Sequence, residues 1–269
     1  MTDIIRIEDI DDERVELYAK YNEPQLLHYN EPDRGLFIAE TPMVIERALD
    51  HGARPLSFFV EEGALENDAV KLIIDRSRPV DVFTAKLDVI NRITGFNLTR
   101  GILAAFKRPE LPDMNELLRT SKCIAVLEGI VNPTNVGAIF RSGAALGVDA
   151  FLLTYDSTDP FYRRSARVSM GTVFQIPWTY IRKEERYVKT LKDAGFTVIS
   201  MALSDDAIPL TDPVLKQGDK RAIIFGSEGD GICADTLAES DHISIIPMHN
   251  GVDSLNVAAS SAVTFWELC

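Results

Sequence analysis

The sequence is poor in the residues that build metal sites and disulfide frameworks. Its 269 residues include only 3 cysteines and 4 histidines. The cysteines Cys123, Cys233 and Cys269 lie too far apart for the paired spacing of zinc sites, and they suggest no disulfide framework. No metal-ligand spacing relates the histidines, which are His28, His51, His242 and His249. We therefore expect no bound metal and a reducing, cytoplasmic environment.

Long hydrophobic runs are also missing. None approaches the roughly 18 to 20 apolar residues that a membrane span requires. The first residues lack the basic segment and apolar core of a signal peptide, so we expect neither secretion nor a membrane partner. Hydrophobic residues make up 46% and charged residues 26%, which is typical of a globular protein and excludes disordered, collagen-like and coiled-coil chains.

Basic residues are in the minority, with 28 lysines and arginines against 41 acidic residues and a net charge of −13. Taken alone, this balance argues against a nucleic-acid partner. The charge is uneven, however: residues 1–70 carry a net of −11, residues 71–108 a net of +5, and residues 163–192 a net of +6. The two positive stretches are either solvated faces or tracks for RNA phosphates, and charge alone leaves both interpretations open.

The first hundred residues alternate between strand-like and helical patterns. Strands are predicted at 35–40, 56–61, 80–84 and 102–106, helices at 13–21, 42–49 and 86–95, and a further apolar run lies at 70–74. A charged stretch with two prolines follows at residues 107–113 and is the best linker candidate. We therefore divide the chain into an N-terminal α/β domain (1–107), a linker (108–119) and a second domain (120–269).

The second domain repeats the alternation. Its predicted strands are 123–127, 151–154, 196–201, 222–225 and 243–246, its predicted helices are 132–147, 184–194 and 254–268, and a short apolar stretch covers 173–176. Strands that alternate with helices indicate an α/β fold with a mostly parallel sheet covered on both faces.

The first motif opens the helix that follows the first strand of this domain. Asn132 and Pro133 resemble a helix cap and first turn, and Gly137 and Arg141 lie one turn apart on the same helical face. The amino end of such a helix favours an anion, so Arg141 is a candidate phosphate ligand. The alternative is a surface arginine beside a tolerated glycine.

Two further motifs also follow predicted strands. Residues 225–231 read Phe-Gly-Ser-Glu-Gly-Asp-Gly, a glycine-rich turn that fits neither a dinucleotide-binding motif nor a phosphate-binding P-loop. Residues 245–259 combine a proline at a strand end, a polar loop and a helix that we expect to begin at Asp253 or Ser254. Each motif alone is equally consistent with an ordinary turn or helix cap.

Together the three motifs resemble the SpoU/TrmH group of S-adenosylmethionine-dependent RNA ribose 2′-O-methyltransferases, in the SPOUT superfamily. The resemblance covers roughly residues 120–269. It rests on Asn135, Gly137, Arg141, Gly226, Glu228, Gly229, the run 246–248, and Ser254, Leu255, Asn256 and Val257. The N-terminal part is more loosely similar to the small α/β substrate-binding domain, related to RNA-binding ribosomal proteins, that often precedes this group.

The resemblance implies a deep trefoil knot in the second domain. It also implies that S-adenosylmethionine binds in this knot near Gly226, Ile246, Met248 and Leu255. Members of the group are homodimers, and the last helix, rich in small residues, is the natural contact surface. No metal is implied.

The resemblance assigns the chemistry to Asn135, Arg141, Glu228, Ser254 and Asn256. Since arginine stays protonated, we expect Arg141 to bind the adjacent phosphate and to lower the pKa of the ribose hydroxyl electrostatically. Glu228 either accepts a proton or orients Asn135. Ser254 and Asn256 offer short hydrogen-bonding groups suited to a phosphate or a ribose.

The target is expected to be structured RNA, with ribosomal RNA favoured and transfer RNA as the alternative. The positive stretch that contains Arg163, Arg164 and Arg167 is then a candidate RNA surface. Other readings are a SPOUT enzyme that methylates a base, and an inactive RNA-binding relative. A nicotinamide dehydrogenase is disfavoured because the required glycine motif is missing.

Overall fold

The structure, a computed structural model, describes residues 4–9, 11–31, 33–94 and 101–269. Contacts between residues divide the chain into two units. The first unit comprises Met1–Glu110 and Phe161–Phe174, and the second comprises Leu111–Pro160 and Gln175–Cys269. The segment Phe161–Phe174 therefore belongs with the N-terminal unit, although we expected it inside a continuous domain of residues 120–269.

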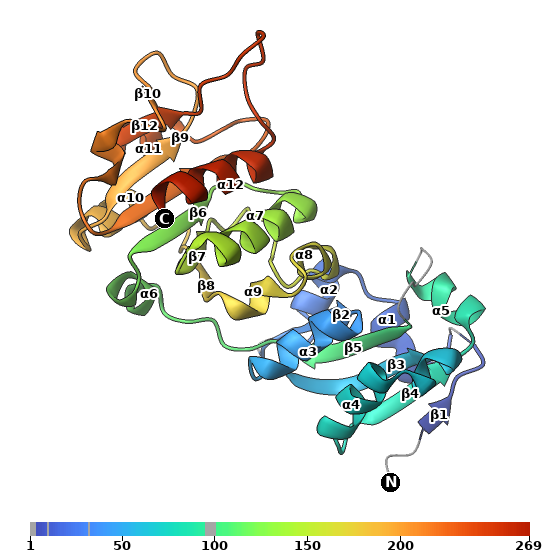
Figure 1. The fold of residues 1–269 in the computed structure, drawn as a ribbon. Helices are drawn as coiled ribbons and strands as arrows, with labels where there is room; N and C mark the ends of the chain where they lie inside the picture. Colours follow the sequence, from blue (N-terminus) through green and yellow to red (C-terminus); the bar gives the residue numbers. More distant parts are fainter. Residues whose placement is uncertain (1–3, 10, 32, 95–100) are drawn as a thin grey trace. The chain divides into compact units, whose positions relative to one another are not determined.

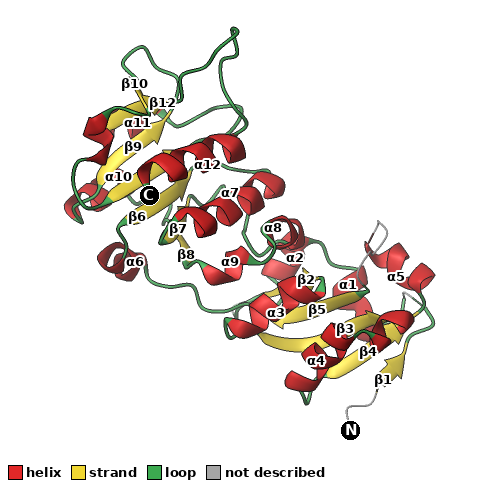
Figure 2. Cartoon of the chain, viewed as in Figure 1, coloured by secondary structure: helices red, strands yellow, loops and turns green. Residues whose placement is uncertain are grey.

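The first unit is built on a five-stranded mixed sheet with the order β1-β4-β3-β5-β2 (Figure 2). Strands β1, β4 and β3 are parallel, whereas β5 runs antiparallel to both β3 and β2. The strands are β1 (Ile4–Arg6), β2 (Leu36–Glu40), β3 (Arg54–Glu61), β4 (Asp81–Ala85) and β5 (Ile102–Lys107). The helices are α1 (Glu16–Ala19), α2 (Glu23–Leu27), α3 (Pro42–Asp50), α4 (Asp68–Arg76), α5 (Leu87–Thr94) and α8 (Arg163–Val168), with 3₁₀ turns at Glu13–Val15 and Glu62–Glu66.

The apolar run at residues 70–74 belongs to helix α4. Its buried residues Val70, Ile73 and Ile74 are spaced by three and four positions, which is the period of a helical face. Asn67 caps the helix by accepting a hydrogen bond from the Ala69 backbone N–H at 2.9 Å. The cap and the spacing together select a helix at this position.

Aromatic rings explain why Phe161–Phe174 belongs to the first unit. The ring of Phe37, in β2, lies 5.2 Å from that of Phe161 and 5.4 Å from that of Phe174, and the latter two rings stack at 5.2 Å. The guanidinium of Arg108 lies 5.0 Å from the centre of the Phe161 ring. The segment thus supplies part of the apolar core on one face of the sheet, which sequence spacing alone did not reveal.

The stretch expected to be a linker, residues 108–119, contains the start of helix α6 (Met114–Thr120). Met114, Leu117 and Leu118 of α6 are buried in the core of the second unit. The irregular segment between β5 and α6 is therefore shorter than the predicted linker. The buried positions of α6 are spaced by three and four residues, which is the period of a helical face and was a signal for this helix.

The second unit has a seven-stranded sheet with the order β10-β12-β9-β11-β6-β7-β8, in which every neighbouring pair is parallel. The α/β class and the parallel sheet predicted for this part of the chain are confirmed. The strands are β6 (Cys123–Leu127), β7 (Ala150–Leu153), β8 (Trp178–Tyr180), β9 (Thr197–Met201), β10 (Ile208–Pro209), β11 (Arg221–Phe225) and β12 (His242–Ile245). The remaining helices are α7 (Pro133–Leu146), α9 (Thr172–Gln175), which spans the boundary of the units, α10 (Tyr187–Asp193), α11 (Ala234–Glu239) and α12 (Val257–Leu268), with a 3₁₀ turn at Pro213–Lys216.

Helices cover both faces of this sheet. Side chains of α6 and α10 share one core with alternate residues of β6, β7, β9 and β11. On the opposite face, α7 and α12 pack side by side (Figure 1). Phe140 of α7 stacks on Phe151 at 4.0 Å, and Phe265 of α12 meets Phe151 and Phe225 edge-on. The two helices that carry the first and third motifs are therefore held together over the strand that precedes the second.

Candidate active site

The glycine-rich loop at residues 226–231 follows β11 directly. It closes on itself, because the Ser227 and Gly231 backbones exchange two hydrogen bonds of 3.2 Å each. A Cβ on Gly226 would lie 2.3 Å from the Gly231 carbonyl carbon, and Gly231 has a φ of +71°. Both positions therefore require glycine, and the tight turn directs Glu228 outward from the end of the sheet.

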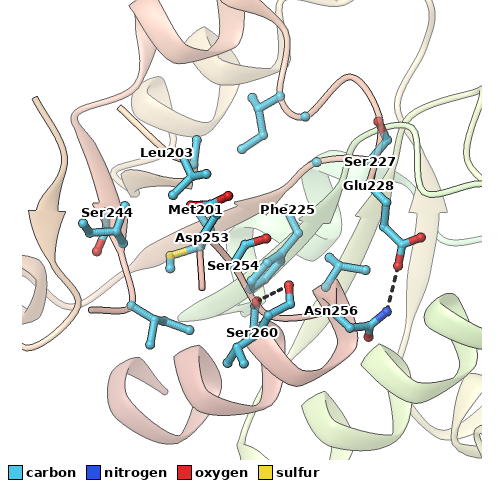
Figure 3. A pocket seen from close by; sticks show the side chains of 18 of the residues that line it. Met201, Leu203, Phe225, Ser227, Glu228, Ser244, Asp253, Ser254, Asn256 and Ser260 are labelled. Carbon is cyan, nitrogen blue, oxygen red and sulfur yellow. Dashed lines mark hydrogen bonds between the residues drawn. The ribbon is translucent and has the colours of Figure 1, made fainter. Parts of the chain in front are cut away.

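Glu228 accepts hydrogen bonds from two asparagine side chains. Its Oε1 lies 2.8 Å from Asn135 Nδ2 and 2.7 Å from Asn256 Nδ2. Asn256 Nδ2 also lies 3.3 Å from Asn135 Oδ1. Figure 3 shows the bond between Glu228 and Asn256 beside the pocket. The structure thus brings together one residue from each of the three motifs.

Asn256 is also the N-cap of α12, because its Oδ1 accepts a hydrogen bond from the Ala258 backbone N–H at 3.0 Å. The helix begins at Val257, later than the Asp253 or Ser254 that we expected. Since the cap occupies the side-chain oxygen, the Asn256 amide N–H groups point at the Glu228 carboxylate. One asparagine therefore both starts the helix and fixes the carboxylate.

A pocket of about 560 Å³ opens next to this cluster, at the carboxyl ends of β9, β11 and β12 (Figure 3). This size is usual for a small-molecule site, roughly 300–1,000 Å³. The predicted cofactor residues Gly226, Ile246, Met248 and Leu255 all line the pocket, as do Glu228, Ser254 and Asn256. Apolar side chains dominate its strand-end walls, while the glycine loop contributes exposed backbone.

Several lining residues were missed from the sequence, among them Met201, Leu203 and Ser244. Met201 ends β9 and Ser244 lies near the end of β12, and β9 is the direct neighbour of β11. Because parallel strands bring their carboxyl ends to one edge, the end of the predicted strand 196–201 was the signal that locates Met201 and Leu203.

Arg141 lies outside this cluster. It is exposed on α7, six residues after Asn135, which corresponds to about 9 Å along the helix axis and a different face. Within the described residues, no hydrogen bond or ion pair engages its side chain. Asn135, in contrast, is only 6% exposed. Of the five predicted catalytic residues, Arg141 is the one that neither joins the carboxylate cluster nor lines the pocket.

The predicted RNA-binding arginines Arg163, Arg164 and Arg167 lie on α8, in the first unit. Arg167 Nη1 is 3.5 Å from the carboxylate of Glu40, which is only 2% exposed. The Arg163 backbone N–H donates to the Glu23 side chain at 2.9 Å. At least part of this positive charge is therefore committed to contacts within the unit.

Two of the cysteines form a disulfide bond, between Cys123 at the start of β6 and Cys269 after α12. The expectation of no disulfide was wrong, because the sequence separation of 146 residues gives no hint that α12 returns to the start of β6. Cys233 is a free, exposed thiol.

Among the residues that the structure describes, no group of three or more His, Cys, Asp or Glu side chains is arranged to hold a metal ion. Within the same residues, no helix has the length and apolar character needed to cross a bilayer.

Comparison with known proteins identifies the family. Residues 122–266 match the model of the SpoU rRNA Methylase family. An uncharacterised tRNA/rRNA methyltransferase of Mycobacterium bovis is 33% identical, over 98% of this chain and 91% of that protein. The 23S rRNA (guanosine(2553)-2′-O)-methyltransferase RlmP of Bacillus subtilis is 27% identical over 86% of this chain and 88% of its own.

Among solved structures, the AdoMet-bound rRNA methyltransferase of Sinorhizobium meliloti superposes with a TM-score of 0.81 at 21% identity. It covers 98% of this chain and 97% of that one. This likeness concerns the fold. The family match spans all three motifs, and the chain belongs to the SpoU rRNA methylase family.

Proposed function

We propose that the protein transfers a methyl group from S-adenosylmethionine to a ribose 2′-hydroxyl of structured RNA, with ribosomal RNA as the substrate class. The observation that carries the proposal is the Glu228 carboxylate, fixed by Asn135 and Asn256 at the rim of the pocket. Family membership and the relative in Bacillus subtilis named as a ribose methyltransferase of 23S rRNA support the reaction class.

The pocket fits the proposed cofactor. Its apolar lining from Phe225, Ile246 and Leu255 suits a purine ring, and the backbone around Gly226 and Met248 suits the polar edges of adenine and ribose. When bound, S-adenosylmethionine supplies an activated methyl group. No metal is required for this chemistry.

The two carboxylate oxygens of Glu228 have different surroundings. Both asparagine amides donate to Oε1, and within the described part of the chain no hydrogen bond reaches Oε2. We assign Oε2 the role of accepting the hydrogen bond, and in the transfer the proton, of the ribose hydroxyl. The asparagines hold the carboxylate in place, so little reorganisation accompanies the reaction.

Arg141 and Ser254 serve the RNA in this proposal. The exposed guanidinium of Arg141 is suited to a phosphate next to the target nucleotide. Ser254, on the loop before α12, lines the pocket and offers a hydroxyl to the ribose or its phosphate. In this proposal the positive charge of α8 extends the phosphate contacts, and the N-terminal unit binds the substrate RNA.

We further propose that the knot implied by the family forms in the second unit and that the protein is a homodimer. Along α12, Ala259, Val263 and Trp266 are exposed at helical spacing, and Trp266 is 78% exposed. A second copy seated on this stripe would cover it. Sedimentation equilibrium should give a mass near twice the 29.9 kDa of the chain, and Ala259→Arg should lower it. A monomer with full activity would contradict the dimer.

Mapping of 2′-O-methylated nucleotides tests the function in the cell. Deletion of the gene should remove one ribose methylation, and expression of the wild-type chain, but not of Glu228→Ala, should restore it. Loss of a methylated base instead would favour the base-methylating alternative. Loss of a transfer-RNA modification would reassign the substrate, and restoration by Glu228→Ala would remove the basis of the proposal.

A further inference from the structure

Glu128, the residue that follows β6, holds both ends of the glycine-rich loop. Its backbone N–H donates to the Phe225 carbonyl oxygen at 2.9 Å, where the loop begins. Its side-chain Oε1 accepts the Cys233 backbone N–H at 2.6 Å, two residues after Gly231. One residue thus spans the two points between which the chain turns around Glu228.

The other oxygen of this carboxylate is anchored from two further elements. Glu128 Oε2 accepts hydrogen bonds from the Thr236 hydroxyl at 2.8 Å and from the Tyr187 hydroxyl. Thr236 is 4% and Tyr187 8% exposed. Burial, followed by the hydrogen bond to Glu128, raises the pKa of Tyr187, so the phenol stays a donor. The carboxylate is therefore fixed by hydrogen bonds from α10 and α11 through Oε2, while its Oε1 accepts the Cys233 N–H at the end of the loop.

Within the loop, the two backbone bonds between Ser227 and Gly231 and a bond of 3.0 Å from the Asp230 N–H to Ser227 Oγ close the turn, but these bonds do not fix the turn relative to the sheet. Residues 228–231 are exposed, and a Cβ placed on Gly229 or Gly231 would meet nothing within 4 Å. Within residues 226–232, Ile232 is the residue whose side chain is buried, and it lies after the loop. A short exposed segment with glycines has high conformational entropy, so its geometry depends on what fixes its ends.

We propose that Glu128 is a positioning residue, which sets the conformation of loop 226–231 for cofactor binding and for the placement of Glu228. The inference rests on the proposed function for its ligand, S-adenosylmethionine. Glu128 itself is absent from the pocket lining, so it acts through the Cys233 N–H and the loop.

Calorimetry with S-adenosylmethionine tests this role. Glu128→Ala should raise the Kd about tenfold, since a charge-assisted hydrogen bond to the loop is lost. Glu128→Gln keeps an oxygen for the Cys233 N–H, and its amide can donate to the two hydroxyls, so its Kd should stay within about threefold of wild type. Tyr187→Phe is the matched control: it removes a bond to the same carboxylate but leaves the contact with the loop, and should keep the wild-type Kd.

Hydrogen exchange of the ligand-free protein gives a second readout. Peptides covering residues 226–233 should exchange faster in Glu128→Ala but not in Tyr187→Phe, at a temperature well below unfolding of both. If Glu128→Ala does not fold, Glu128→Asp replaces it in both experiments. The aspartate is one methylene too short to reach the Cys233 N–H, so this variant should also bind S-adenosylmethionine more weakly and exchange faster at residues 226–233.

Three results overturn the inference: a wild-type Kd for the alanine or aspartate variant, equal weakening by Tyr187→Phe, or unchanged exchange of the loop. If wild type itself binds no S-adenosylmethionine, the proposed function fails, and the inference fails with it.

Discussion

At the scale of single residues, the site is a network of hydrogen bonds in which each side chain orients the next. Asn256 accepts the Ala258 N–H and donates to Glu228, while Asn135 donates to the same oxygen. Each asparagine uses both ends of its amide, so neither can rotate without losing a bond. The carboxylate is thereby oriented before any ligand arrives.

Asn256→Ala should therefore lower both activity and stability. Loss of the cap costs about 1 kcal/mol of unfolding free energy, and loss of a donor to the carboxylate should reduce kcat about 100-fold. Asp113→Ala removes the cap of α6, a 2.9 Å bond from the Asn115 N–H, and controls for the loss of a cap alone. Urea unfolding and steady-state kinetics measure both effects. Equal activity of the two variants would show that Asn256 is only a cap.

At the scale of elements, α8 separates two kinds of arginine. Both Arg164 and Arg167 are exposed on this helix, but Arg167 Nη1 also lies 3.5 Å from the buried carboxylate of Glu40. Arg167→Glu should destabilise the first unit by about 1–3 kcal/mol, less than for a fully buried pair because the Arg167 side chain is 43% exposed. Arg164→Glu should weaken RNA binding, because it reverses a positive charge on the predicted RNA surface. Thermal unfolding and filter binding distinguish the two, and identical behaviour in both assays would contradict the division.

The helices and strands show which parts of the fold local sequence patterns predict. Local signals sufficed for α7, where Asn132 caps the start and Gly147 ends the helix with a φ of +92°. They failed where tertiary contacts decide: the Phe161–Phe174 segment joins the first unit through Phe37, which no local pattern encodes. They left residues 70–74 unassigned, because a short apolar run fits a strand as well as a helix.

The candidate site divides in the same way. The family resemblance named Asn135, Glu228 and Asn256 as candidates, and the structure shows that their side chains are hydrogen-bonded to one another. The position of Arg141 outside the cluster required coordinates, because motif order does not give distances between side chains. Glu128 gave no signal, since its role is to bridge segments about 100 residues apart in sequence.

At the scale of the whole chain, the disulfide closes the second unit by joining its first strand to the last residue. Reduction should lower the free energy of unfolding by about 2–4 kcal/mol, because the unfolded chain loses a long cross-link. Urea unfolding with and without dithiothreitol measures the change, and Cys123→Ser should show no dependence on reductant. Thiol titration of the oxidised protein should find one thiol per chain, Cys233. Three reactive thiols in protein purified without reductant would contradict the bond.

The central claim is that the Glu228 cluster supports methyl transfer to a ribose. The most direct measurement incubates unmodified ribosomal RNA with the protein and S-adenosylmethionine, then identifies the modified nucleoside by mass spectrometry after complete digestion. The account predicts a single 2′-O-methylated nucleoside, formed at least about 100-fold more slowly by Glu228→Gln. A methyl group on a base, or full activity of Glu228→Gln, would contradict it.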